Sequence, residues 1–158
     1  MSTDYRGGIM GSTNTVGYKF PSLVENLDLA VNVGDSATGE YFGYGIGYSM
    51  MGVELGYVVE STGTVENTSI SLGASFGDIS VGVDQIDYDS DTDTNDRETS
   101  AYGVSYALGD ITLAYEIGSM DDGDGTEIEN HSQIAASYAI ATGITGVITT
   151  SEIDSTTD

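Results

Sequence analysis

The sequence predicts an all-β protein, an antiparallel up-and-down meander of about ten strands. Three observations support this prediction. Apolar residues recur at every second position through most of the chain, which is the period of a strand with one apolar face. Glycine-containing turn signals separate these stretches. Twenty-two glycines and one proline among 158 residues argue against long helices.

Each expected strand is justified by its own alternating series. The strands cover residues 14–20, 27–33, 41–50, 53–60, 68–76, 79–86, 100–108, 111–118, 132–141 and 144–152. In the N-terminal half the apolar series are Val16, Tyr18 and Phe20; Leu27, Leu29, Val31 and Val33; Phe42, Tyr44, Ile46, Tyr48 and Met50; Val53, Leu55, Tyr57 and Val59; and Ile70, Leu72, Ala74 and Phe76. In the C-terminal half they are Ile79, Val81 and Val83; Tyr106 and Leu108; Ile111, Leu113, Tyr115 and Ile117; Ile134, Ala136, Tyr138 and Ile140; and Ile144 and Ile148.

The connections between these strands alternate in expected length. Short turns are predicted at Met51-Gly52, Gly77-Asp78, Gly109-Asp110 and Thr142-Gly143, with a slightly longer one after Pro21. Long polar loops are predicted at 34–40, 61–67, 87–99 and 119–131. The same hairpin is therefore repeated four times, with short turns at one end of the sheet and long acidic loops at the other.

Charge and composition exclude several classes of function. The chain has 26 acidic and three basic residues, a formal net charge of −23. Nucleic acid is not an expected partner, because phosphates are neutralised by Lys and Arg. The chain has no cysteine, so disulfides and thiolate metal sites are excluded. No cofactor is expected.

Two architectures share the period of two. In a soluble β-sandwich the apolar face is the core; in a transmembrane β-barrel it meets lipid and the polar face lines a lumen. The barrel is favoured by uniform strands of roughly 8–10 residues, by alternating connections, and by aromatic residues at similar positions before the short turns. These residues are Tyr48, Phe76, Tyr106 and Tyr138. The alternative is a soluble acidic β-sandwich, an adhesin-like binding module with calcium-binding loops.

The chain resembles the Gram-negative general porins of the outer membrane. The segment "NTVGYKFPSLVENLDLAVNV", with Tyr18 and Pro21, is similar to the segment that follows the constriction loop of such porins, and the hairpins from Tyr41 to Thr149 are similar to later porin strands. The resemblance implies a trimeric diffusion pore for small hydrophilic solutes in the outer membrane of a Gram-negative bacterium. Ten strands are fewer than the 16–18 of an open porin, and a signal peptide and a constriction loop are not identifiable. We therefore expect residues 1–158 to be a single porin-like β-barrel domain that is incomplete at both ends.

The small and polar face of the predicted sheet supplies the candidate site. Glu54, Asp84 and Glu116 lie on this face, with Lys19 as the opposing charge. In a barrel these side chains line the pore, and a ring of acids favours cations. His131 is expected only to begin a strand.

Two other motifs carry little chemistry. Asp87, Asp89, Asp91 and Glu98 match positions 1, 3, 5 and 12 of an EF-hand loop, but position 6 is Thr92 and no helices flank them, so they are only weak metal candidates. Ser75 in "GASFG" matches a nucleophile elbow, which requires a strand-to-helix turn and a histidine partner. Here one strand leads into another, so no enzyme activity is expected.

Overall fold

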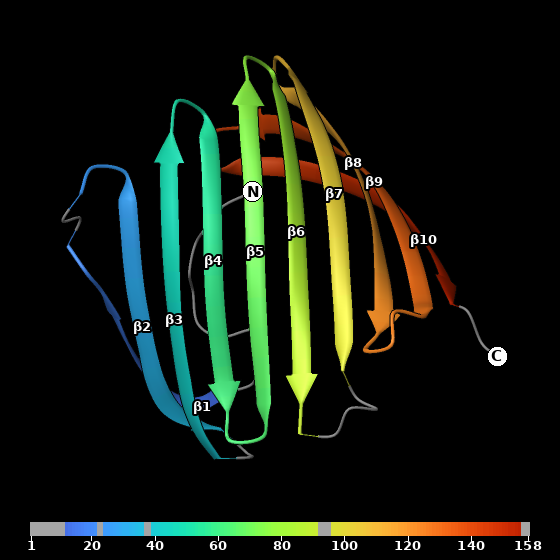
Figure 1. The fold of residues 1–158 in the computed structure, drawn as a ribbon. Coiled ribbons are helices and arrows are strands. Elements are labelled where there is room, and N and C mark those ends of the chain that lie inside the picture. The colour runs from blue at the N-terminus through green and yellow to red at the C-terminus, as the bar shows by residue number, and fades with distance from the viewer. Residues whose placement is uncertain (1–11, 22–23, 37–38, 92–95, 156–158) are drawn as a thin grey trace.

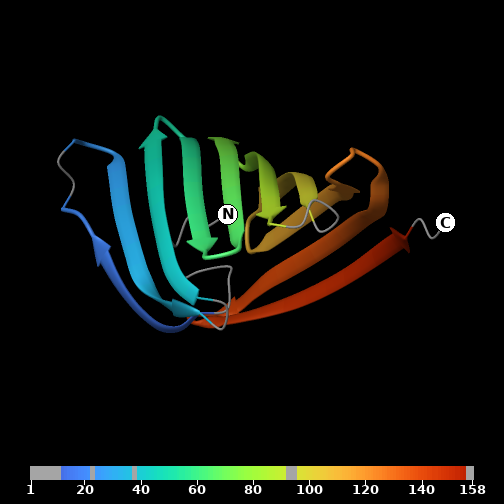
Figure 2. The same ribbon diagram turned by 60° about the horizontal axis from the view of Figure 1, so that its bottom comes forward.

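The protein forms one strongly curved antiparallel sheet. A computed structural model describes residues 12–21, 24–36, 39–91 and 96–155. The strands follow chain order across the sheet (Figures 1 and 2). They are β1 (Ser12–Lys19), β2 (Leu27–Ser36), β3 (Gly39–Met50), β4 (Val53–Thr62), β5 (Val65–Phe76), β6 (Ile79–Ser90), β7 (Arg97–Leu108), β8 (Ile111–Asp122), β9 (Glu127–Ala141) and β10 (Ile144–Ser155). The described residues contain no helix long and apolar enough to cross a membrane.

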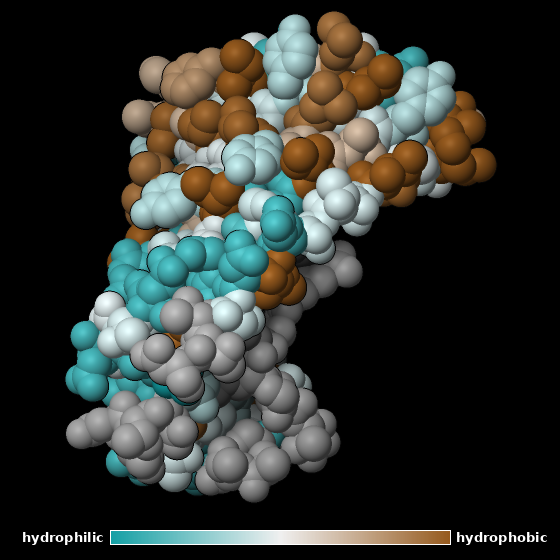
Figure 3. Space-filling model, turned by 90° about the vertical axis from the view of Figure 1, so that its right-hand side faces the viewer, coloured by the Kyte–Doolittle hydropathy of each residue, from teal (hydrophilic) through white to brown (hydrophobic). Residues whose placement is uncertain are grey.

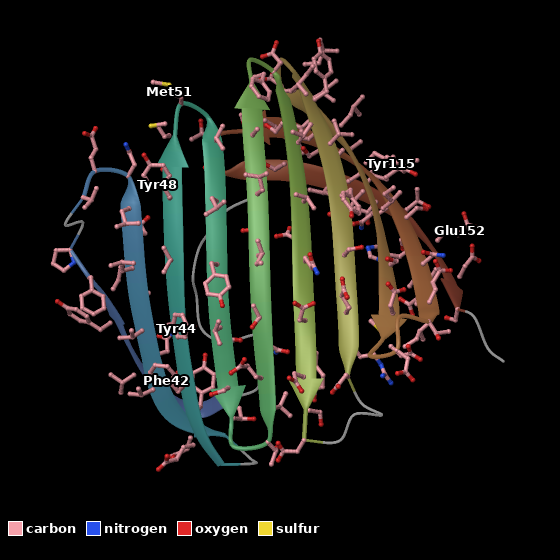
Figure 4. The ribbon with its side chains drawn as sticks, viewed as in Figure 1. Phe42, Tyr44, Tyr48, Met51, Tyr115 and Glu152 are labelled. Atoms are coloured by element: carbon pink, nitrogen blue, oxygen red, sulfur yellow. The ribbon has the colours of Figure 1, made fainter. Side chains whose placement is uncertain are left out.

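The burial of the two faces is the reverse of that in a soluble sheet. Along β8 the apolar residues Ile111, Leu113 and Tyr115 are 39%, 49% and 46% exposed, whereas the small or polar residues between them are half-buried. Figure 4 shows Tyr115 pointing away from the ribbon on its outer, convex side. Within the part of the chain that the structure describes, all ten strands belong to this one sheet, and no second sheet covers its apolar face. The sandwich alternative is therefore wrong, and the all-β meander is confirmed as an open, partial barrel.

The convex face is divided into an apolar half and a polar half. In Figure 3 the half of the molecule on the side of the short turns is largely hydrophobic, and the opposite half is hydrophilic. The apolar series on β5, β7, β8 and β9 each span seven residues, about 20 Å of strand. This length is close to the apolar band of about 25 Å on outer-membrane barrels.

Aromatic side chains mark the short-turn border of this band. Tyr48, Phe76, Tyr106 and Tyr138 all point outward, with 39%, 67%, 42% and 51% of their surface exposed. Each lies within four residues of a short turn. Such girdles of aromatic residues are typical of the membrane–water interface.

The prediction of long polar loops at 61–67 and 119–131 is wrong. The loops predicted at 34–40 and 87–99 include residues 37–38 and 92–95, which lie outside the described residues. The strands extend past the expected limits at this end, so only residues 63–64 separate β4 from β5, and only residues 123–126 separate β8 from β9. The apolar alternation stops before the backbone pairing stops, because the extended ends carry polar residues on their outward face. An apolar period detects the part of a strand that faces hydrocarbon, whereas the hydrogen-bond ladder continues into water.

The four short turns lie where they were predicted. The longer turn predicted after Pro21 includes residues 22–23, which lie outside the described residues. In the β3–β4 turn both central residues, Met51 and Gly52, have positive φ, 53° and 82°. This is the type I′ geometry, whose twist matches that of the flanking strands. Gly52 adopts positive φ readily, whereas Met51 is an unusual residue in the left-handed region.

We expect Met51→Asn to stabilise the protein by about 1 kcal/mol, because Asn adopts positive φ at lower cost than Met. Met51 is 91% exposed, so the change removes little packing. Urea unfolding of the detergent-folded protein measures the difference, with Met51→Val as the destabilising counterpart. An Asn variant less stable than the Val variant would contradict the turn assignment.

The apolar convex face and the polar concave face should tolerate a new charge differently. Leu113→Lys places a charge in the apolar band and should cost about 2–4 kcal/mol of stability in lipid vesicles. Ala114→Lys, on the neighbouring inward position, should cost much less, because the concave face is wet. For each variant, the stability loss is measured as the fraction of protein that keeps its folded mobility on unheated SDS gels. Equal losses would show that the two faces are assigned wrongly.

Candidate functional site

The concave face of the sheet carries a hollow of about 280 Å³. Its lining is dominated by glycine, alanine and serine, and its carboxylates come from two distant strands. The inward lining residues are Glu54, Gly73, Ser75, Ser80, Gly82, Gly103, Ser105, Ala114, Glu116, Gln133 and Ala135. Small side chains keep this wall thin, and hydroxyl and amide groups keep it hydrophilic.

Strand register places two acidic residues on one transverse row of this hollow. Glu54 on β4 pairs with Gly73 on β5, which pairs with Gly82 on β6. Gly82 pairs with Gly103 on β7, which pairs with Glu116 on β8. Three glycines thus separate the two glutamates, and the row between the two charges has no side chains.

Asp84 lies on the same face, one inward position along β6 from Gly82. Its cross-strand partners are Ser71 and Ala101. It does not line the hollow that contains Glu54 and Glu116. Three predicted acidic residues therefore share the concave face, and two of them share one cavity.

Lys19 is the fourth predicted residue, and the structure places it apart from the other three. Its Nζ lies 2.9 Å from Oδ1 of Asp28 on the neighbouring strand β2. Both side chains are well exposed, 63% and 45%, so this ion pair contributes little stability. Its main effect is to offset the Lys19 charge locally, so Lys19 does not oppose Glu54 or Glu116 directly.

His131 was expected to begin a strand, and this prediction is wrong. It lies inside β9, directly opposite Gly118 of β8. Its Nε2 is 3.7 Å from Oε1 of Glu116. A Cβ on Gly118 would clash with Cε1 of His131 and lie 2.6 Å from the backbone oxygen of Ser100. The imidazole therefore rests on the glycine, beside a carboxylate of the hollow. The period-two series of Gln133, Ala135 and Ser137, extended backward, would have placed His131 on this face.

Sequence reasoning also missed a buried polar group on the inward face of β3, β4 and β5. Tyr41, Glu60 and Asn67 are 2%, 5% and 6% exposed. The Tyr41 hydroxyl donates a 2.7 Å hydrogen bond to Oε1 of Glu60, and Glu60 pairs with Asn67 in the ladder. Tyr41 shares the period of Gly43 and Gly45, which was the available signal. These contacts link β3, β4 and β5 on the inward face near the polar end of the sheet.

The weak metal candidates are not brought together by the fold. Asp87 and Asp89 follow each other along the outward face of β6, Glu98 lies opposite Asp87, and Asp91 comes after the strand ends. Glu98 accepts a 2.8 Å hydrogen bond from Nε2 of Gln85. Among the described residues no three His, Cys, Asp or Glu side chains are grouped closely enough to hold a metal ion.

Comparison with known proteins gives one family. A family model described as Gram-negative porin matches residues 2–158. No curated protein matches the sequence.

Solved structures share the fold at low sequence identity. A mutant of the Rh. blastica porin superposes with a TM-score of 0.72 at 17% identity, over 87% of this chain and 49% of the porin. A loop-deletion mutant of OmpT, an outer membrane protein of Vibrio cholerae, superposes with a TM-score of 0.72 at 14% identity, over 93% of this chain and 59% of OmpT. Pseudomonas aeruginosa OccK10 superposes with a TM-score of 0.65 at 14% identity, over 88% of this chain and 55% of OccK10. This chain therefore spans about half the length of these proteins.

The glycines of the concave wall differ in how much space surrounds them. We expect Gly118→Ala to destabilise the protein by about 1–3 kcal/mol, because its Cβ has no room beside His131 and Ser100. Gly103→Ala is the matched control: the nearest atoms would lie 3.8 Å away, so stability should be unchanged or slightly raised. Urea midpoints in detergent compare the two. A Gly118→Ala midpoint at or above that of Gly103→Ala would contradict the packing of His131 on Gly118.

Proposed function

The chain belongs to the Gram-negative porin family, and we propose that it forms part of a channel through which small hydrophilic solutes diffuse, with a preference for cations. The family places it in the outer membrane of a Gram-negative bacterium. Family and fold indicate a channel rather than an enzyme. The observation that carries the proposal is the inverted burial of the sheet, with an apolar face more exposed than its polar face. Such a sheet suits lipid outside and water inside.

The proposed barrel requires partners for both edges of the sheet. Within the described residues β1 pairs only with β2, and β10 only with β9. In hydrocarbon an unpaired strand edge leaves N–H and C=O groups without hydrogen bonds, each at a cost of several kcal/mol. We therefore take residues 1–158 as one arc of a single barrel domain, whose outer edges pair with further strands. The Rh. blastica porin, about twice as long, illustrates the length of chain that such a barrel uses.

The partners of the proposed channel follow from its two faces. The convex apolar band contacts outer-membrane lipid, and the concave face contacts the diffusing solute. As in the general porins that it resembles, the full-length protein is expected to assemble as a homotrimer. No nucleic acid and no cofactor enter this function.

Cation preference is supported by the placement of charge on the concave face. Glu54 and Glu116 line one hollow, Asp84 lies on the adjacent row, and Lys19 is paired with Asp28. Acidic groups in a confined aqueous space raise the local concentration of cations and repel anions. The chain's net charge of −23 adds a field of the same sign.

Single-channel recording tests both parts of this proposal. The full-length protein in a planar bilayer should conduct in discrete steps and give a cation-selective reversal potential in a KCl gradient. Replacing both Glu54 and Glu116 with Gln should lower the K⁺/Cl⁻ permeability ratio, roughly twofold or more. Glu152→Gln is the matched control, because Glu152 points outward from β10 (Figure 4), and it should leave the ratio unchanged.

Absence of conductance would refute the channel itself. Conductance with anion selectivity would refute only the cation preference. An equal effect of the Glu152 control would show that the overall charge of the protein, rather than the lining of the hollow, sets the preference.

A further inference from the structure

His131 is held against the acidic hollow by the shape of the wall. The ring lies over Gly118, where any side chain would clash with it, and its Nε2 reaches to 3.7 Å from Oε1 of Glu116. Glycine inside a strand is less favourable than alanine, and it often marks a place where another group approaches closely. The contact between His131 on β9 and Glu116 on β8 is therefore favoured by the shape of the wall, and it borders the proposed solute path.

Both side chains remain open to water and ions. The side chain of His131 is 29% exposed and that of Glu116 is 38% exposed. Proton exchange with the solvent is therefore unobstructed. Histidine is the side chain whose charge ordinarily changes between pH 5 and 8.

We propose that His131 sets the effective charge of this wall, so that the cation preference of the channel weakens when its imidazole is protonated. This inference rests on the proposed function, because it describes the regulation of the same hollow. With a neutral imidazole, Glu116 contributes a full negative charge to the lumen. With an imidazolium, the two side chains form an ion pair and this charge is cancelled locally. Glu54 and Asp84 then remain as the acidic lining.

The other titratable groups near His131 do not compete with its imidazolium for Glu116. On the inward face of β8 they are Glu116 and, farther along, Asp122; on β9 itself the neighbour is Glu129. β10 offers Ser151 and Ile153 on the inward face opposite this part of β9, neither of which titrates. Glu152 and Asp154 of β10, together with Glu127, line a second hollow that His131 also borders. Asp84 lies two strands beyond β8. All of these charged groups are carboxylates, so no inward cation on the described parts of β8, β9 and β10 competes with the imidazolium.

The experiment is a pH series of reversal potentials on the full-length channel. In a KCl gradient the K⁺/Cl⁻ permeability ratio should fall roughly twofold between pH 8 and pH 5.5. His131→Gln should remove the change over this range and keep the high-pH ratio. His131→Arg should hold the low ratio at every pH. Ser132→Gln, on the outward neighbour of His131, is the matched control and should follow the wild type.

Further variants separate the possible outcomes. Glu116→Gln should lower the ratio at pH 8 and reduce its dependence on pH, because the partner charge is gone. A His131→Gln channel that keeps the full pH dependence would overturn the inference while leaving the channel function intact. A wild-type channel that does not conduct, or that prefers anions at pH 8, would instead refute the proposed function. Folded mobility on unheated SDS gels confirms that each variant forms the barrel. Gly118→Ala displaces the imidazole and should also abolish the pH dependence of the K⁺/Cl⁻ permeability ratio.

Discussion

The structure depends on one constraint, the need of every backbone N–H and C=O group to find a partner where water is absent. In a sheet only neighbouring strands supply these partners, and β2 to β9 each have one on both sides. From β3 to β8 the register runs without a shift, whereas irregularities occur only in the β1–β2, β8–β9 and β9–β10 ladders. The β8–β9 irregularity lies between Met120 and Asp121, beyond the apolar series that ends at Ile117. The ladder is therefore regular along the apolar part of β8, where an unpaired group would cost most.

Given a complete ladder, the side chains are free to divide between two solvents. Successive residues of a strand point to opposite faces, so alternating apolar and polar residues along each strand produce an apolar convex face and a polar concave face. The apolar side chains need no protein partner, since lipid replaces the core. This is why Leu113 and Tyr115 are more exposed than the alanine between them, and why the described chain needs only one layer.

Few side chains surround the charged groups of Glu54 and Glu116 on the concave face. Gly73, Gly82 and Gly103 place no side chains between Glu54 and Glu116, and Gly118 gives His131 its position beside Glu116. Each glycine weakens its strand slightly, so the wall is less stable than one of alanine or valine. In the proposed channel, the absence of side chains at these glycines leaves the carboxylates of Glu54 and Glu116 open to water and ions.

Alternation and turn residues were enough to predict the number of strands, their order along the chain, the short turns and the face of each residue in an apolar series. A period of two states the face directly, so Glu54, Asp84 and Glu116 could be assigned to the polar face without coordinates. The residues that meet across strands are seen only in the folded sheet: Glu54 and Glu116 share a hollow, Lys19 is paired with Asp28, and His131 lies on Gly118. The tertiary structure also decided where the strands end at the polar side, beyond the last apolar residue. Alternation is a property of one strand, whereas cross-strand neighbours depend on register, twist and curvature, which arise only when all the strands pair.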